Sequence, residues 1–421
     1  MIPRRKTRQI SVGPVRVGGD APISIQSMTK TDTRDIRATV AQIRRLEKAG
    51  CEIVRVAVVD EEAARAISEI KKKVRVPLIA DIHFHHCLAL QAMKSGADGL
   101  RINPGNIGGR DRLKAVVTEA RARSIPIRIG VNSGSVEKDL LKRFGGATPE
   151  AMVMSAFRFI EWMEGFGFQQ IKVSLKASDV PRTLEAYRLF SKQADYPLHV
   201  GVTEAGRGTG ALVKSSIGIG YLLSEGIGDT IRVSLTGEPV QEVIVGYEIL
   251  KALKLRQHGV EIISCPTCGR CEIDVTGLVR QIEKKVRSVT CPLTVAIMGC
   301  VVNGPGEARE ADLGIAGGKR VGVLFRKGKI VKKIREKDFL DVLLSEIRKR
   351  MVEGYPPTQK TTGSARGGMR KPRLDHSCAG VLMLRRVSPL ADNPPKPWRR
   401  RVFHGSTAGS AVGLHFLSDG W

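Results

Sequence analysis

The stretch that decides the fold is CEIVRVAVVDEEAARAISEIKKKVRVPLIADIHF, residues 51–84. It contains an apolar run at 51–58, a helical pattern rich in alanine and charged residues, and a second apolar run at 77–82. This order of strand, helix and strand is typical of two parallel strands joined by a crossover helix. The stretch therefore predicts an α/β fold, and the flanking sequence decides which one.

Eight apolar runs of this kind lie between residues 22 and 255: ISIQSM (23–28), CEIVRVAV (51–58), PLIADI (77–82), GLRI (99–102), PIRIGV (126–131), QIKVSLK (170–176), PLHVGVT (197–203) and TIRVSLT (230–236). Amphipathic helical stretches separate them. Eight such units over roughly 235 residues match the size of a TIM (β/α)8 barrel. The alternative, a doubly wound open sheet, normally has a glycine-rich turn after its first strand, and none follows Met28. We predict a TIM barrel over residues 1–257.

Polar side chains interrupt or close these apolar runs: Arg55, Asp81, His83, Arg101, Asn103, Arg128, Asn132, Lys176, Thr203, Glu204, Arg232 and Ser234. In a barrel the carboxyl ends of all strands meet at one rim, where active sites are built. A single arginine there is most simply a solvated strand end. Five cations together would repel one another without an anion, and arginine suits phosphate because its donors are paired. His83 is equally compatible with a packed imidazole and with an active-site donor.

A smaller α/β module is predicted over residues 258–353. It contains SCPTCGR, with Cys265 and Cys268, and GCVVNGPGE, with Cys300 and Glu307. Two thiolates at this spacing can bind one metal centre from a tight turn, and a third can complete the site. Three sulfurs and a carboxylate suit an iron–sulfur cluster. A structural zinc site and buried free cysteines remain alternatives, and Cys271 is interpreted as a bystander or a substitute ligand.

The formal net charge of +27 would attract phosphorylated substrates, acidic proteins, nucleic acid or anionic membranes. However, no basic run is interleaved with aromatic residues, and no apolar stretch reaches membrane-spanning length. We therefore expect neither nucleic acid nor membrane as a partner. Eight cysteines at irregular spacing and no export signal indicate a reducing, cytoplasmic setting. Residues 354–421 are rich in Pro, Gly and Arg without a period, which predicts a disordered tail.

The order of motifs identifies a resemblance. SMTKTDTRD, ADIHF, LRINPGN, RIGVNSGS, VSLKASD, GVTEAG and IRVSLTGEP precede the two cysteine motifs, and the match runs from about residue 7 to residue 351. This series resembles the bacterial 4-hydroxy-3-methylbut-2-en-1-yl diphosphate synthase family. The resemblance implies the reductive ring opening and dehydration of 2-C-methyl-D-erythritol 2,4-cyclodiphosphate to the linear hydroxymethylbutenyl diphosphate, a step in isoprenoid precursor biosynthesis.

The same resemblance implies roles for individual residues. A [4Fe-4S] cluster would be held by Cys265, Cys268, Cys300 and Glu307. Diphosphate-binding positions fall on Arg55, Arg101, Arg128, Lys176, Arg232 and Ser234, and positions around the carbon skeleton fall on Asp81, Asn103, Asn132, Thr203 and Glu204. Glu204 matches the carboxylate that supplies a proton to the departing hydroxyl.

Reduced flavodoxin or ferredoxin would supply electrons, and the enzyme would form a head-to-tail homodimer. Two other classes remain open at this point. One is a zinc-bearing binding protein on a catalytically empty barrel, and the other is a barrel enzyme that handles a pterin or corrinoid.

Overall fold

A computed structural model describes residues 2–83, 85–104, 106–287, 289–300, 306 and 308–352. Its larger sheet has eight parallel strands in the order β8-β7-β6-β5-β4-β3-β10-β9. The strands are β3 (Ser24–Met28), β4 (Ile53–Val58), β5 (Leu78–Ile82), β6 (Gly99–Ile102), β7 (Ile127–Asn132), β8 (Ile171–Lys176), β9 (His199–Val200) and β10 (Thr230–Ile231). A parallel bridge between Val173 and Leu198 joins β8 to β9 and closes the ring. All eight predicted runs therefore form strands, and the predicted TIM barrel is confirmed.

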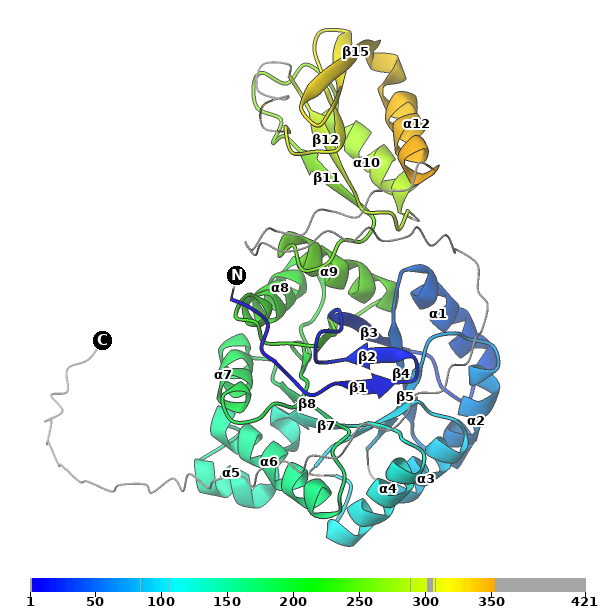
Figure 1. The fold of residues 1–421 in the computed structure, drawn as a ribbon, viewed down its shortest axis with the longest axis vertical. Coiled ribbons are helices and arrows are strands. Elements are labelled where there is room, and N and C mark those ends of the chain that lie inside the picture. The colour runs from blue at the N-terminus through cyan, green and yellow to red at the C-terminus, as the bar shows by residue number, and fades with distance from the viewer. Residues whose placement is uncertain are drawn as a thin grey trace, which may run out of the picture. The chain divides into compact units, whose positions relative to one another are not determined.

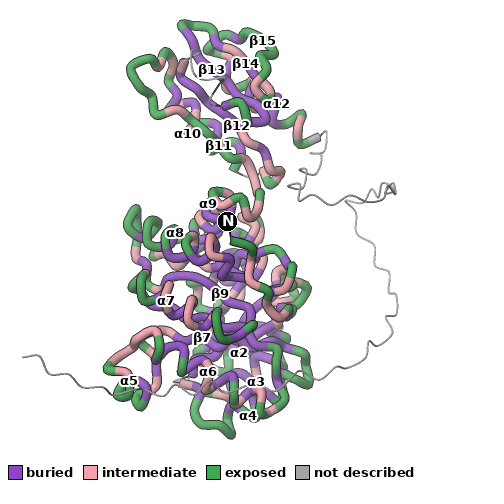
Figure 2. The backbone as a smooth tube through the Cα atoms, turned by 60° about the vertical axis from the view of Figure 1, so that its left-hand side comes forward, coloured by how far each residue is buried: buried purple, intermediate pink, exposed green. Residues whose placement is uncertain are grey.

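Helices surround this ring (Figure 1): α1 (Ile36–Lys48), α2 (Glu61–Lys71), α3 (His86–Lys94), α4 (Arg110–Ala122), α5 (Lys138–Phe144), α6 (Pro149–Gly165), α7 (Val180–Ser191), α8 (Gly208–Ser224) and α9 (Pro239–Ala252). The first helix shows how the sequence sets them. Asp35 caps α1 by accepting a hydrogen bond from the Ala38 N–H. Val40, Ile43 and Leu46 recur at helical spacing and are buried against the strands. The tube view shows the strands buried, with exposed positions on the helices and loops around them (Figure 2).

A short antiparallel hairpin precedes the barrel and was not predicted from the sequence. It is formed by β1 (Ile10–Val12) and β2 (Val15–Val17). Ile10, Val12 and Val17 pack on the buried side chains of Ile53 and Ile79. These two isoleucines lie near the amino ends of β4 and β5, so the hairpin covers the end of the barrel away from the predicted site.

The C-terminal module has its own five-stranded sheet in the order β11-β12-β13-β14-β15. Its elements are β11 (Val260–Ser264), α10 (Val275–Val286), β12 (Leu293–Met298), β13 (Leu313–Ala316), β14 (Val321–Arg326), β15 (Lys329–Arg335) and α12 (Phe339–Val352), with a 3-10 turn (η2, Glu336–Asp338) before the last helix. The first three strands are parallel, and β14 and β15 return as an antiparallel hairpin. The predicted α/β class of this module is confirmed.

Within the described part of the chain, no helix combines the length and apolar character needed to cross a bilayer. The predicted tail at 354–421 lies outside the described residues.

Candidate active site

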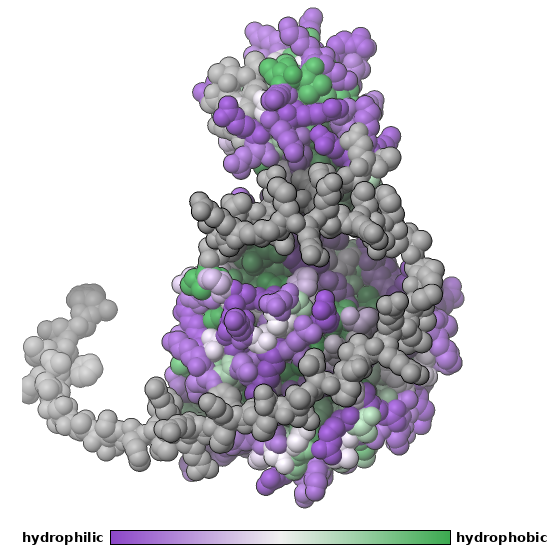
Figure 3. Space-filling view, in the orientation of Figure 1, coloured by the Kyte–Doolittle hydropathy of each residue, from purple (hydrophilic) through white to green (hydrophobic). Residues whose placement is uncertain are grey.

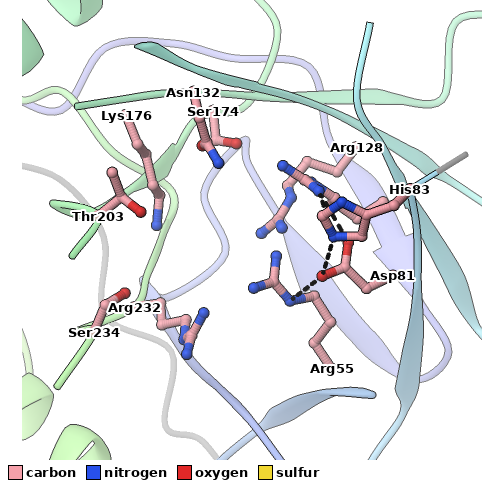
Figure 4. Close-up of a pocket in the computed structure, with 11 residues that line it drawn as sticks. Arg55, Asp81, His83, Arg128, Asn132, Ser174, Lys176, Thr203, Arg232 and Ser234 are labelled. Atoms are coloured by element: carbon pink, nitrogen blue, oxygen red, sulfur yellow. Dashed lines mark hydrogen bonds and ion pairs between the residues drawn. The ribbon is translucent and has the colours of Figure 1, made fainter. Parts of the chain in front are cut away.

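A pocket opens at the carboxyl ends of the barrel strands (Figure 4). Its lining comes from seven of the eight barrel strands or the residues that directly follow them: Arg55, Asp81, His83, Arg101, Arg128, Asn132, Ser174, Lys176, Thr203, Arg232 and Ser234. Because β-strand side chains alternate between faces, residues two apart such as Ser174 and Lys176 both point into the barrel. Nine of the predicted substrate-binding residues therefore meet in one cavity.

Asp81 is the carboxylate in this lining. Its side chain is buried, and its oxygens lie 3.4 Å from Arg55 Nε, 3.2 Å from Arg101 Nη1 and 3.5 Å from His83 Nε2. Burial by itself would raise the pKa of Asp81, but the neighbouring cations and the His83 hydrogen bond outweigh it and hold the pKa well below its usual range. The ionised form of Asp81 is thus favoured, and its oxygens orient two arginines.

The cations outnumber this carboxylate. Burial lowers the pKa of Arg55 to about 9, even though Asp81 opposes the shift. Burial also lowers the pKa values of Arg128 and Lys176, and the surrounding cations add to both shifts. Each of these shifts means that the charged form is disfavoured in the pocket as it stands. A bound polyanion would reverse the effect, because it supplies the negative charge that the lining lacks.

Two glycines make room for two of the cations. A Cβ at Gly130 would lie 2.5 Å from Arg101 Nε, and the Gly130 carbonyl accepts a hydrogen bond from Arg101 Nη2 at 3.2 Å. A Cβ at Gly201 would lie 2.6 Å from Lys176 Nζ and would overlap the Arg232 carbonyl oxygen. Real Cβ atoms essentially never approach so closely. The glycines in the runs PIRIGV and PLHVGVT therefore shape the pocket.

The cysteines gather at one end of the module's sheet. Cys265 directly follows the end of β11, and Cys300 lies two residues after the end of β12. These two parallel strands pair directly. The sulfurs of Cys265 and Cys271 both face the open side of Gly299: an added Cβ there would overlap Cys271 Sγ and lie 3.2 Å from Cys265 Sγ. The Gly299 N–H donates to Cys265 Sγ at 3.2 Å. This cradle is built from thiols and a residue without a side chain.

The cysteine motif itself folds as a tight turn. The Cys271 N–H donates to the Cys268 carbonyl at 2.8 Å, and Thr267 has a positive φ of 55°. Cys265, Cys271 and Cys300 are partly buried and Cys268 is exposed. Among the described residues no group of three metal-ligating side chains is close enough to hold an ion, and Glu307 lies outside those residues.

Comparison with known proteins gives the family. The model of the GcpE TIM-barrel domain matches residues 7–247, and that of the GcpE protein C-terminal domain matches residues 261–349. The chain belongs to the GcpE family. It is 60% identical over 349 residues to a protein of Thermodesulfovibrio yellowstonii, covering 83% of this chain and 100% of that protein. It is 58% identical over 352 residues to one of Geobacter sulfurreducens, covering 84% and 100%. Both are named 4-hydroxy-3-methylbut-2-en-1-yl diphosphate synthase (flavodoxin). The resemblance inferred from the motifs is confirmed.

Two predicted site residues of this GcpE-family chain are not in the pocket lining. Asn103 is buried at the end of β6, and its carbonyl accepts hydrogen bonds from the backbone N–H groups of Asn106 and Ile107. Glu204 directly follows Thr203, is exposed, and has a φ of 52°. This left-handed backbone is uncommon for a residue with a side chain and is enriched at functional sites.

Sequence analysis missed Glu242, which fixes one wall of the pocket from helix α9. Its side chain is fully buried and accepts hydrogen bonds from Ser27 Oγ at 2.9 Å, Arg232 Nε at 3.3 Å and the Leu235 N–H at 3.2 Å. Lys30 Nζ lies 3.3 Å from it. The carboxylate therefore orients Arg232 and holds the segment that carries Ser234. No sequence pattern predicts this role, because a single glutamate in a helical stretch does not stand out from its neighbours.

Ser174 was also missed. It lies two residues before Lys176 on β8, so the two side chains share a face of the strand, and this spacing could have revealed it. His83, for which two interpretations were open, does line the pocket. Its Nε2 lies 3.3 Å from Arg101 Nη1.

Proposed function

We infer that this chain catalyses the reductive ring opening and dehydration of 2-C-methyl-D-erythritol 2,4-cyclodiphosphate to 4-hydroxy-3-methylbut-2-enyl diphosphate. It is an oxidoreductase of isoprenoid precursor biosynthesis. The observation that carries this inference is the pocket, in which five cations face one carboxylate. A polyanion of small size matches that lining, and close relatives carry the name of this synthase.

The barrel residues bind and orient the substrate in this proposal. Arg55, Arg101, Arg128, Lys176, Arg232 and Ser234 hold the cyclic diphosphate. Arginine grips phosphate oxygens with two parallel donors, so several arginines fix both position and orientation. Asp81, Asn103, Asn132 and Thr203 surround the carbon skeleton and hydroxyls.

The cysteine end of the module fits an iron–sulfur group. Its soft thiol donors suit iron–sulfur clusters or zinc, and Gly299 carries no side chain that would crowd the sulfurs of Cys265 and Cys271. We propose that Cys265, Cys268, Cys300 and Glu307 hold a [4Fe-4S] cluster, which would supply the electrons of the reaction. A carboxylate is a harder ligand than a thiolate and exchanges more readily. Glu307 would therefore be the most readily displaced of the four proposed ligands. Cys271 remains outside the proposed ligand set.

Glu204 is proposed to donate a proton to the departing hydroxyl. Its left-handed backbone and its position beside Thr203 support the assignment, since such conformations persist where the surrounding structure imposes them. Glu204→Gln keeps the shape and removes the acidic proton. We expect turnover to fall by about 100-fold or more, with little change in substrate affinity, as for loss of a general acid. Near-normal turnover at unchanged affinity would refute the role.

The remaining parts follow from the same function. We propose that reduced flavodoxin donates the electrons, with ferredoxin as the alternative, and that the enzyme acts in the cytoplasm as a head-to-tail homodimer. Residues 1–257 would form the substrate domain and 258–353 the cluster domain. Removing residues 258–421 from one chain, and supplying the cluster domain on a second chain with a disabled barrel, tests the dimer. Lack of complementation would count against it.

The deciding experiment is the metal content of protein purified without oxygen. About four irons and four acid-labile sulfides per chain support the proposed cofactor and justify assaying the cyclodiphosphate. One zinc without sulfide, persisting after attempted cluster assembly, would overturn it in favour of a zinc-bearing binding protein.

A further inference from the structure

The hairpin of β14 and β15 leaves one of its faces without a covering helix. In this hairpin, Val321 lies opposite Arg335 and Val323 lies opposite Lys333. Residues directly opposite each other share a face of the sheet. Phe325 and Ile330 form the next pair on this face. Helices α10 and α12 pack on the other face, where Leu324 and Ile334 are buried.

We call the uncovered side the hairpin face and define it by Val321, Val323, Ile330, Lys333 and Arg335. Its apolar residues are unusually exposed for a folded sheet: Ile330 is 62% exposed, Val321 44%, and the neighbouring bulge residue Val331 46%. An apolar patch bordered by hydrophilic surface is visible on this module (Figure 3). Such patches with a polar rim mark interaction sites more often than chance exposure.

The hairpin and the residues that flank it are strongly basic. Residues 319–337 contain nine lysines and arginines, against one acidic residue, Glu336: Lys319, Arg320, Arg326, Lys327, Lys329, Lys332, Lys333, Arg335 and Lys337. Among the described residues only Arg326 and Arg335 of these nine form ion pairs, with Glu346 and Asp338. The remaining cations are free to attract an acidic surface, which speeds encounter and selects the partner.

The hairpin face also lies close to the cysteines. On the same side of the sheet, Phe325 belongs to a small buried cluster with Met298 and Ala316, and both Val323 and Cys265 pack against this cluster. A partner seated on the hairpin face would therefore contact Val323, which packs against the same apolar cluster as Cys265. Exposed apolar residues, a basic rim and proximity to the thiols coincide at this surface.

We propose that the hairpin face is the docking site for an acidic electron-transfer protein of the flavodoxin type. This inference rests on the proposed function and adds where the donor binds. The apolar centre supplies the contact area, while the lysines steer the acidic partner and set its orientation.

The test reverses charge at the site and at a matched control in the full-length, cluster-loaded protein. Lys333→Glu with Arg335→Glu changes the hairpin face, and Lys284→Glu with Lys285→Glu makes the same charge change on α10. All four residues are exposed. Binding of an acidic flavodoxin is measured by calorimetry at several salt concentrations, and turnover is driven either by reduced flavodoxin or by reduced methyl viologen.

The hairpin pair should weaken flavodoxin binding by about 10-fold or more and flatten its salt dependence, whereas the α10 pair should change it by less than about 2-fold. Viologen-driven turnover should be unchanged in both. Equal losses in the two pairs, unchanged binding in the hairpin pair, or a hairpin pair that only alters self-association would overturn the docking site. Tighter binding of duplex DNA than of flavodoxin to the same face would overturn it too.

Failure of the proposed function gives a different pattern. Wild-type protein would then convert the cyclodiphosphate with neither reductant. The calorimetric comparison of the two charge-reversal pairs would still decide whether the hairpin face docks an acidic flavodoxin.

Discussion

Gly299 is the position where one added methyl group tests the cysteine cradle most directly. In Gly299→Ala the new Cβ would overlap Cys271 Sγ and lie 3.2 Å from Cys265 Sγ. Favourable contacts between heavy atoms begin near 3.5–4 Å, so Cys271 must move by about 1 Å and Cys265 by a few tenths. Over-packing of this kind typically costs about 1–3 kcal/mol. We expect a loss of stability of that size in the cluster-free protein, and an iron content below that of wild type.

The double variant Gly299→Ala with Cys271→Ala separates the two sulfurs. Removing the Cys271 sulfur relieves the severe overlap, so most of the stability should return. Because Cys271 is not among the proposed ligands, the iron content should return as well, and Cys271→Ala alone should keep about four irons. Gly269→Ala is the matched control, since an added Cβ there meets nothing within 4 Å. The measurements are iron and sulfide content and denaturant unfolding, and neither depends on enzyme turnover.

Two results would refute this reasoning. If Gly299→Ala matched Gly269→Ala in both stability and iron, the sulfurs would not face Gly299 in solution. If Cys271→Ala lost the cluster, Cys271 would be a ligand and the proposed set would be wrong.

Three further predictions concern the barrel. Gly130→Ala should weaken binding of inorganic pyrophosphate by about 10-fold, because it displaces Arg101, whereas Gly134→Ala, with open space around its Cβ, should not; equal affinities in calorimetry would contradict this. Glu242→Ala should lower the unfolding free energy by about 2–3 kcal/mol because the partly buried Arg232 and the buried Ser27 hydroxyl lose their carboxylate partner, against less than about 0.5 kcal/mol for the exposed Glu238→Ala. Burial lowers the pKa of Lys172 from 10.5 to about 7, so the unfolded chain binds more protons between those values and this group makes stability rise with pH there. Lys172→Met should therefore be more stable than wild type near pH 7, with the gain vanishing near pH 10; a gain independent of pH in denaturant titrations would refute it.

The barrel strands could be predicted because parallel strands covered on both faces are nearly continuous apolar runs, and polar residues inside such runs stand out. Arg55, Arg101 and Arg128 were found in this way. The same reasoning failed for β15, whose sequence KIVKKIR exposes most of its residues at a sheet edge. It also missed the hairpin of β1 and β2, whose strands are three residues each and carry too little pattern.

The residues that sequence analysis missed share a physical cause. Glu242 acts on Arg232 across a distance of ten positions and from a helix, so its role exists only once α9 packs against the barrel. Gly130 and Gly201 matter for the volume that they leave empty, which becomes visible only when Arg101 and Lys176 are in place. For Asn103 and Glu204 the sequence predicted more than the structure shows. Both follow strand ends, yet neither lines the pocket.

The site residues also explain why so many cations in one pocket are costly to the fold. Burial and mutual repulsion disfavour the charged forms of Arg128 and Lys176, and burial disfavours that of Arg55, so each cation held there destabilises the folded chain. Asp81 and Glu242 offset part of this cost, and both are also bonded to arginines that line the pocket. Adding more internal carboxylates would stabilise the barrel but would compete with a diphosphate for the same donors. The pocket therefore carries an excess of positive charge that a polyanionic ligand can neutralise. Binding of such a ligand should stabilise the barrel, and a ligand with more negative charge should stabilise it more.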